Sequence, residues 1–239
     1  MLSALLTISL FPCYVLSQNT GIKTCTPTCP TTYIPPTPTT QCRCGDPKLG
    51  PTSLPTQPIV LAQLLDGYDT FGGLGVQQYL NEWLDTSNPA KLKYRNPPGS
   101  GFTIDACGNE KKTVHHFKKG ELVDRVGAVD GPYLAPVCDP IKNRAIPPRN
   151  LCNTGTPVYT VFEVCEEFWA YQGQAQPWFN QAGLGNHIAL PDGLSTKDLR
   201  TGSNHTLRIL SEDEVASLNC PNPKFTPKCS QSGYKVDLH

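Results

Sequence analysis

Two stretches decide the fold: residues 122–126 read LVDRV, and residues 158–168 read VYTVFEVCEEF. Both are rich in β-branched and aromatic residues, alternate in part between apolar and polar side chains, and lie between Gly, Pro and Asn residues, as β-strands do. Between residues 76 and 84, VQQYLNEWL, apolar side chains recur at the spacing of an amphipathic helix, which Asn88-Pro89 should end. The sequence therefore predicts an α+β fold dominated by sheet, with few short helices.

Composition limits what surrounds these elements. The chain has 239 residues, 24 prolines, 20 glycines and 38% hydrophobic residues, which predicts one loop-rich domain. Residues 18–43 are mostly Thr, Pro, Cys and small polar residues, too poor in apolar side chains to fold by themselves. A formal net charge of +0 and a pI near 6.9 give no electrostatic reason to expect nucleic acid or an anionic membrane as a partner.

The N-terminus and the cysteines both indicate an oxidising, extracellular location. Residues 1–17 are apolar and uncharged with small residues before Gln18, which predicts a signal peptide too short to span a membrane; a buried N-terminal helix is the alternative. Asn204-His205-Thr206 is a glycosylation acceptor that suits an exported loop. Outside Cys13 the cysteines are even in number, and we expect disulfides whose pairing cannot be read from the sequence. They are Cys25, Cys29, Cys42, Cys44, Cys107, Cys138, Cys152, Cys165, Cys220 and Cys229. A zinc site among the first four is the weaker alternative, because no partner pair lies at finger-like distance.

Several polar groups have both a structural and a functional interpretation. Arg125 would pair with the neighbouring Asp124, which composition favours, or project toward an anionic ligand. His115-His116, flanked by lysines, is typical of a solvated hairpin and less so of a metal or anion patch. Residues 212–214, Glu-Asp-Glu, are the expected first turn of a helix capped by Ser211, with calcium ligation as the alternative. The Gly-x-Gly loop after Trp178-Phe179 is either a tight turn over a core or a close approach to a ligand.

Taken in order, five motifs resemble a known family. They are DRVG at 124–127, GPYLAP at 131–136, RAIPP at 144–148, VFEV at 161–164 and PWFNQAGLG at 177–185. Together they resemble the TNT domain, named for the tuberculosis necrotizing toxin. CGDPKLGP at 44–51, Trp83 and NPPGSGF at 96–102 resemble the secreted fungal members, which are surface NAD glycohydrolases.

Composition and the resemblance, which covers residues 44 to 188, together predict a division of the chain. Residues 1–17 form the signal peptide and residues 18–43 a disulfide-stapled appendage. Residues 44–210 form the TNT-like domain, with a helical part at about 58–86 and a catalytic part at about 100–190. Residues 211–239 form a C-terminal disulfide-linked extension.

The same resemblance implies hydrolysis of NAD(P)+ to nicotinamide and ADP-ribose outside the cell or at its surface. Arg125 and His187 would be catalytic, with His187 in the place of the family's catalytic glutamine; because of that replacement, a catalytically silent binding protein is the alternative function. The substrate-binding set is Tyr133, Trp178, Phe179, Gln181, Gly183, Gly185 and Val126, the last where the family usually has an aromatic residue. NAD is the substrate, so no cofactor is expected; calcium as a structural ion and a homodimer are implied by resemblance only.

Overall fold

The computed structural model describes residues 29, 40–85, 87, 93–152, 155, 157–203 and 205–229. The predicted signal peptide at 1–17, most of the predicted appendage at 18–43, Cys25 and the glycosylation acceptor Asn204 lie outside these residues. In the described ranges no helix is both long and apolar enough to cross a membrane.

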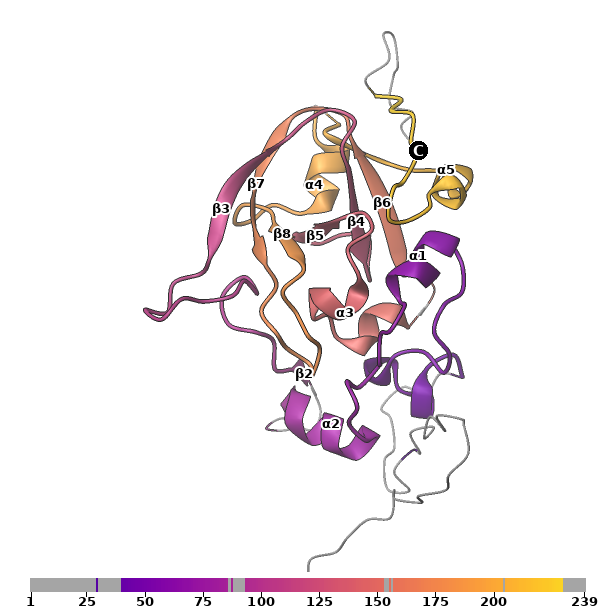
Figure 1. Cartoon of the computed structure of the whole chain (residues 1–239), viewed down its shortest axis with the longest axis vertical. Helices are drawn as coiled ribbons and strands as arrows, with labels where there is room; N and C mark the ends of the chain where they lie inside the picture. Colours follow the sequence, from indigo (N-terminus) through magenta and orange to yellow (C-terminus); the bar gives the residue numbers. More distant parts are fainter. Residues whose placement is uncertain are drawn as a thin grey trace, which may run out of the picture.

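A seven-stranded antiparallel sheet forms the body of the molecule (Figure 1). In spatial order its strands are β3 (Lys112–Phe117), β7 (Phe168–Gln174), β8 (Asn186–Ala189), β5 (Tyr133–Pro136), β4 (Leu122–Val126), β6 (Tyr159–Val164) and β9 (Leu207–Ile209). β6 is buried along its whole length, because strands cover both its edges and apolar clusters cover both its faces. The prediction of a sheet-dominated α+β fold is confirmed.

Two details of the predicted strands are wrong. Residues 158–168 do not form one strand: β6 ends at Val164, and β7 begins at Phe168 in another part of the sheet. The chain turns there because Cys165 and Glu166 both donate their amides to the Thr206 carbonyl. His115 and His116 lie within β3, an outer strand of the sheet, and not in a hairpin loop, because their backbone pairs with Ala170 and Trp169 of β7.

A helical segment lies at one end of the sheet and contains α1 (Ile59–Leu64) and α2 (Val76–Trp83). The predicted amphipathic helix is confirmed, and it buries Val76, Tyr79 and Leu80. It ends before Asn88-Pro89 because Leu84 is already extended and pairs with Tyr94, in the small sheet of β1 (Leu84–Asp85) and β2 (Lys93–Tyr94).

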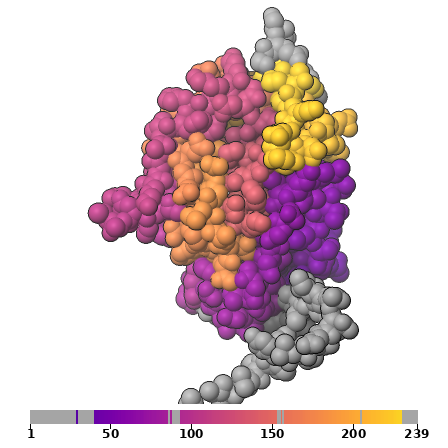
Figure 2. All heavy atoms as spheres, viewed as in Figure 1, coloured from indigo at the N-terminus to yellow at the C-terminus, as the bar shows by residue number. Residues whose placement is uncertain are grey.

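The remaining elements are short. They are the 3-10 turns η1 (Arg43–Gly45), η2 (Pro47–Leu49) and η4 (Pro148–Leu151) and the helices α3 (Ile141–Arg144), α4 (Thr196–Thr201) and α5 (Glu212–Ser217). Figure 2 shows the helical segment (indigo to violet) lying against the C-terminal segment (yellow). That contact joins α1 to α5 through one apolar cluster.

Four disulfides staple these parts together. The pairs are Cys29–Cys44, Cys42–Cys152, Cys138–Cys220 and Cys165–Cys229. Two of them tie the N-terminal appendage to the domain, and the other two tie down the segment that follows α5. The zinc alternative does not hold for Cys29, Cys42 and Cys44, which are all bridged. Cys107 departs from the expected framework: it is exposed and forms no disulfide within the described part of the chain.

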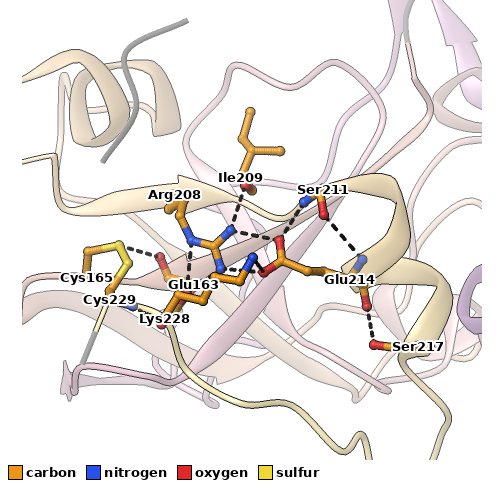
Figure 3. A network of polar contacts seen from close by, with 9 residues as sticks. All are labelled: Glu163, Cys165, Arg208, Ile209, Ser211, Glu214, Ser217, Lys228 and Cys229. Carbon is orange, nitrogen blue, oxygen red and sulfur yellow. Dashed lines mark hydrogen bonds and ion pairs between the residues drawn. A yellow bond between two sulfur atoms is a disulfide. The ribbon is translucent and has the colours of Figure 1, made fainter. Parts of the chain in front are cut away.

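The C-terminal segment is also held by a network of charges (Figure 3). The fully buried Glu163 accepts hydrogen bonds from Arg208 Nε at 3.0 Å and Nη2 at 2.5 Å, and from the Cys229 amide at 2.8 Å. Glu214 accepts from Arg208 Nη1 at 2.8 Å and pairs with Lys228 Nζ at 3.0 Å. Two carboxylates and two cations thus connect β6, β9, α5 and the end of the described chain.

The acidic run at 212–214 is the first turn of α5, as predicted. The Ser211 hydroxyl accepts the Glu214 amide, and the Glu214 carboxylate accepts the Ser211 amide at 2.8 Å, a reciprocal cap. Glu214 is bound by Arg208 and Lys228, so calcium would have to displace protein cations from it. Across the residues that the structure describes, no three His, Cys, Asp or Glu side chains are grouped to hold a metal ion.

Candidate active site

A cleft of about 680 Å³ opens at the end of the sheet that faces the helical segment. Its walls come from β4, β5 and β8, from the loop 96–101 and from the turn that follows α3. This volume lies in the range of pockets that enclose small molecules and cofactors. The cleft is therefore the candidate active site.

Arg125 lies on β4 and reaches across the strand end to the loop that precedes β5. Its Nε donates to the Ala128 carbonyl at 2.5 Å and its Nη1 to the Tyr133 carbonyl at 2.6 Å. Gly131 makes this arrangement possible, because a Cβ atom there would overlap the guanidinium. Burial lowers the pKa of Arg125 from its ordinary value, yet a guanidinium remains charged at neutral pH. Its Nη2 lies 3.4 Å from the Asp130 carbonyl oxygen. Among the described residues Arg125 forms no ion pair, so the N–H groups that these three carbonyls leave unused are available for an anion in the cleft.

The predicted pair between Asp124 and Arg125 is wrong, because successive side chains on a strand point to opposite faces. Asp124 is fully buried and instead pairs with Arg144 at the end of α3. Arg144 Nη2 lies 3.0 Å from Asp124 Oδ2, and the Tyr159 hydroxyl donates to the same oxygen at 2.9 Å. Burial opposes the charge of Arg144, but Asp124 outweighs it, so that the pKa of Arg144 lies above its ordinary value. The pair fixes β4 and α3 relative to each other beside the cleft.

His187 is mostly buried on β8 and faces the cleft. Its Nε2 lies 2.8 Å from the Ser100 carbonyl oxygen, and its ring packs against Phe102 and Tyr133, with centroids 4.8 Å and 5.2 Å away. A carbonyl oxygen can only accept, so Nε2 carries the proton and the neutral ring keeps its lone pair on Nδ1. Burial lowers the pKa of His187 from its ordinary value, with the Ser100 carbonyl and Glu110 acting in the opposite direction. The ring is therefore a neutral base at physiological pH.

The Gly-x-Gly loop that leads to His187 packs on protein and does not approach the cleft. A Cβ on Gly183 would lie 2.6 Å from the Pro177 backbone, and one on Gly185 would lie 2.6 Å from Asp139 Oδ2. The Gly185 amide donates to the Asn143 carbonyl at 2.8 Å, which fastens the loop to α3. The interpretation as a tight turn is thus confirmed. The resemblance implied that Gly183 and Gly185 bind the substrate, but neither glycine lines the cleft.

Two other predicted binding residues also lie outside the cleft lining. Trp178 donates its indole N–H to the Arg95 carbonyl at 2.6 Å and packs against Trp83, with the rings tilted by 56° and their centroids 5.5 Å apart. The buried Gln181 donates to the Asp69 carbonyl at 2.7 Å. Gln181 thus ties the loop to the helical segment, and Trp178 ties it to α2 and to the residue that follows β2.

The structure brings together in one cleft the other five predicted residues: Arg125, Val126, Tyr133, Phe179 and His187. Sequence reasoning missed further lining residues, namely Ser100, Asp124, Arg144, Arg149, Asn150, Gln176 and Asn186. A signal for Ser100 was present, since it stands between two glycines in the NPPGSGF block. Arg144 also belongs to a motif, RAIPP, but nothing local to that motif points to a buried carboxylate partner.

Comparisons with known proteins identify relatives of the chain. The family model for tuberculosis necrotizing toxin, TNT, matches residues 116–208, which run from the end of β3 into β9. The conidial surface nicotinamide adenine dinucleotide glycohydrolase nadA of Aspergillus fumigatus is 37% identical over 198 residues, covering 79% of this chain and 79% of that protein.

Two solved structures are also similar. Tuberculosis necrotizing toxin complexed with its immunity factor matches with a TM-score of 0.46 and 18% identity, over 64% of this chain and 82% of that one. Rhs1-CT in complex with its cognate immunity protein matches with a TM-score of 0.28 and 15% identity, over 44% of this chain and 80% of that one. The identity and coverage shared with the Aspergillus fumigatus glycohydrolase establish the relationship: this chain belongs to the TNT family, together with that enzyme.

Proposed function

We propose that the protein is an extracellular NAD+ glycohydrolase that cleaves the bond between nicotinamide and ribose, giving nicotinamide and ADP-ribose. The single observation that carries the proposal is one cleft holding a guanidinium with no counter-ion among the described residues, an exposed tyrosine and a neutral histidine. The relative that is 37% identical to this chain carries the name of an NAD glycohydrolase of the conidial surface, which supports both the reaction and a secreted or surface location.

This reaction suits a cleft that lacks a pair of catalytic carboxylates. A typical glycosidase must protonate its leaving group. In NAD+ the nicotinamide nitrogen already carries the positive charge and leaves as a neutral molecule with the electron pair of the broken bond. The protein then has to hold the pyrophosphate, orient the two rings and admit water to C1′ of the ribose, where positive charge develops.

Arg125 and Tyr133 are placed for the first two tasks. The free N–H groups of Arg125 would donate to a phosphate oxygen, a charge-assisted contact that a planar guanidinium makes well. Tyr133 is 42% exposed, and its ring would stack on the cationic nicotinamide ring, which an aromatic face attracts. Because Arg125 also binds the Tyr133 carbonyl, the two groups keep a fixed separation.

His187 is placed for the third task. With Nε2 held by the Ser100 carbonyl, Nδ1 would accept a proton from a water molecule as the water oxygen bonds to C1′. A glutamine at this position would only orient the water, so His187 makes the rate depend on pH. The rate should fall as His187 becomes protonated.

Nicotinamide release from NAD+, followed from about pH 5 to about pH 8, tests the proposal. Wild type should release nicotinamide, and Arg125→Ala should be strongly impaired. If wild type releases none and His187→Gln does, the chain is a silent member of the family whose chemistry was lost with the glutamine. Chromatography of the products separates hydrolysis from cyclisation or ADP-ribosyl transfer.

Other features stay predictions. Cleavage of NADP+, a homodimer and calcium as a structural ion rest on the resemblance to secreted fungal members. The signal peptide at 1–17 and glycosylation of Asn204 rest on sequence patterns alone. Mass spectrometry of the secreted protein would test the last two.

A further inference from the structure

One acidic residue beside the cleft has no part in the proposed reaction. Glu110 lies just before β3 and bridges to Ile104. Its Oε1 accepts the Ser100 amide at 2.5 Å, and its Oε2 pairs with Lys112 Nζ at 2.5 Å. The Glu110 side chain is only 19% exposed, so both carboxylate oxygens are committed to protein partners in a partly dry site.

Ser100 connects Glu110 to His187. Its amide is held by Glu110, and its carbonyl accepts from His187 Nε2 at 2.8 Å. The neighbouring glycines permit this, since Gly99 and Gly101 have φ of 59° and 84°. A Cβ on Gly99 would overlap Glu110 Oε1, and one on Gly101 would lie 3.5 Å from His187 Nε2. The loop is thus shaped to fit between the carboxylate and the imidazole.

Charged and titratable groups approach His187 from several elements. From the β3 side come Glu110, whose charge favours the protonated ring, and its partner Lys112, which lies 5.6 Å from the centroid of Phe102. Tyr133 packs on the ring from β5. Beyond β5, Asp139 Oδ2 lies against Gly185, two residues before His187, where a Cβ would be 2.6 Å from it. Of these groups, Glu110 is the carboxylate that hydrogen bonds connect to the imidazole, through the amide and the carbonyl of Ser100.

We propose that Glu110 is a positioning residue for His187: it holds Ser100 so that the Ser100 carbonyl fixes the Nε2–H tautomer, and Nδ1 is left facing the cleft. Its negative charge also sets how readily the ring is protonated. The consequence for catalysis rests on the proposed function, whereas the coupling between Glu110 and His187 does not.

The test uses Glu110→Gln, which keeps an oxygen to accept the Ser100 amide but removes the charge. Glu166→Gln is the matched control, because Glu166 forms an exposed ion pair with Lys119 at 2.8 Å, away from the cleft. Ring ¹⁵N NMR follows the titration and tautomer of His187 in each protein. We expect the His187 titration to move to lower pH in Glu110→Gln and to stay at the wild-type pH in Glu166→Gln.

In activity, the acidic limb of kcat/KM should shift in the same direction. Glu110→Ala also releases Ser100, so kcat should fall by roughly 10- to 100-fold at every pH, since a misplaced catalytic group costs about that much. Unchanged His187 titration and tautomer in folded Glu110→Gln would overturn the proposal. If wild type releases no nicotinamide, the proposed function fails, while the NMR titration still decides whether Glu110 governs His187.

Discussion

The network that anchors the C-terminal segment makes a sharp prediction about stability (Figure 3). Replacing Arg208 by methionine keeps most of the side-chain volume and removes the guanidinium. Glu163, which is fully buried, would then lose the donors at 3.0 Å and 2.5 Å and keep, among the described residues, only the Cys229 amide at 2.8 Å. Glu214 would keep Lys228 and the Ser211 amide.

The expected cost follows from the carboxylate left behind. Removing one partner of a buried ion pair costs about 3–5 kcal/mol, because the other charge stays buried without compensation. Against a typical unfolding free energy of about 5–15 kcal/mol, that loss is large. Arg208 does not line the cleft, so nicotinamide release by the folded fraction should be unchanged.

Urea unfolding with the disulfides intact measures the loss. Arg200→Met is the matched control: Arg200 pairs with Asp130 at 2.5 Å, but Asp130 is 48% exposed, and such pairs contribute about 0–1 kcal/mol. Equal losses of unfolding free energy in the two variants would refute the reasoning, since the burial of Glu163 would then add nothing to the cost. A smaller loss in a double variant that also carries Glu163→Leu would support it, because no charge is left buried.

Three further predictions concern the cleft and pH. Arg144→Met leaves Asp124 buried without its cation and should lower the unfolding free energy by about 3–5 kcal/mol. The same variant should also impair nicotinamide release. Wild-type values of both quantities would contradict the account. Burial lowers the pKa of His187, so the midpoint of the acidic limb of kcat/KM should lie below the ordinary histidine pKa of about 6.5. His187→Gln should abolish that limb. A midpoint above the ordinary histidine pKa would show that another group titrates. Burial acts to raise the pKa of Glu214, but Arg208 and other donors outweigh it and lower that pKa to about 2. The stabilising contribution of Glu214 is therefore present above its unfolded pKa and is lost as pH falls toward 2. Stability curves of wild type and Arg208→Met that run parallel over that range would count against this.

The sequence predicted those parts of the fold that depend on local patterns. β4, α2 and the capped first turn of α5 were all readable, because burial periodicity and helix capping involve residues a few positions apart. The end of β6 was not, because it depends on the Thr206 carbonyl, far along the chain.

The site was only partly readable for the same reason. Arg125 and His187 stood in motifs, but the partner of Asp124 is Arg144, chosen by the packing of α3 on the sheet. Trp178 looked like a ligand-stacking residue because of its neighbours, yet α2 offers it a second tryptophan and the residue after β2 offers it the Arg95 carbonyl. The partner of His187, Ser100, lies 87 residues earlier in the chain. The two glycines beside Ser100 mark it as a special position, but which side chain it meets is set by the fold.

The most direct test of the account is nicotinamide release from NAD+ at neutral pH by wild type and Arg125→Ala, with folding of both checked by circular dichroism. The account predicts release by wild type and a loss of at least about tenfold in kcat/KM in the variant, because a hydrogen bond to a charged group contributes about 1.5–3 kcal/mol. Equal release by the two folded proteins, or none by wild type, would contradict it.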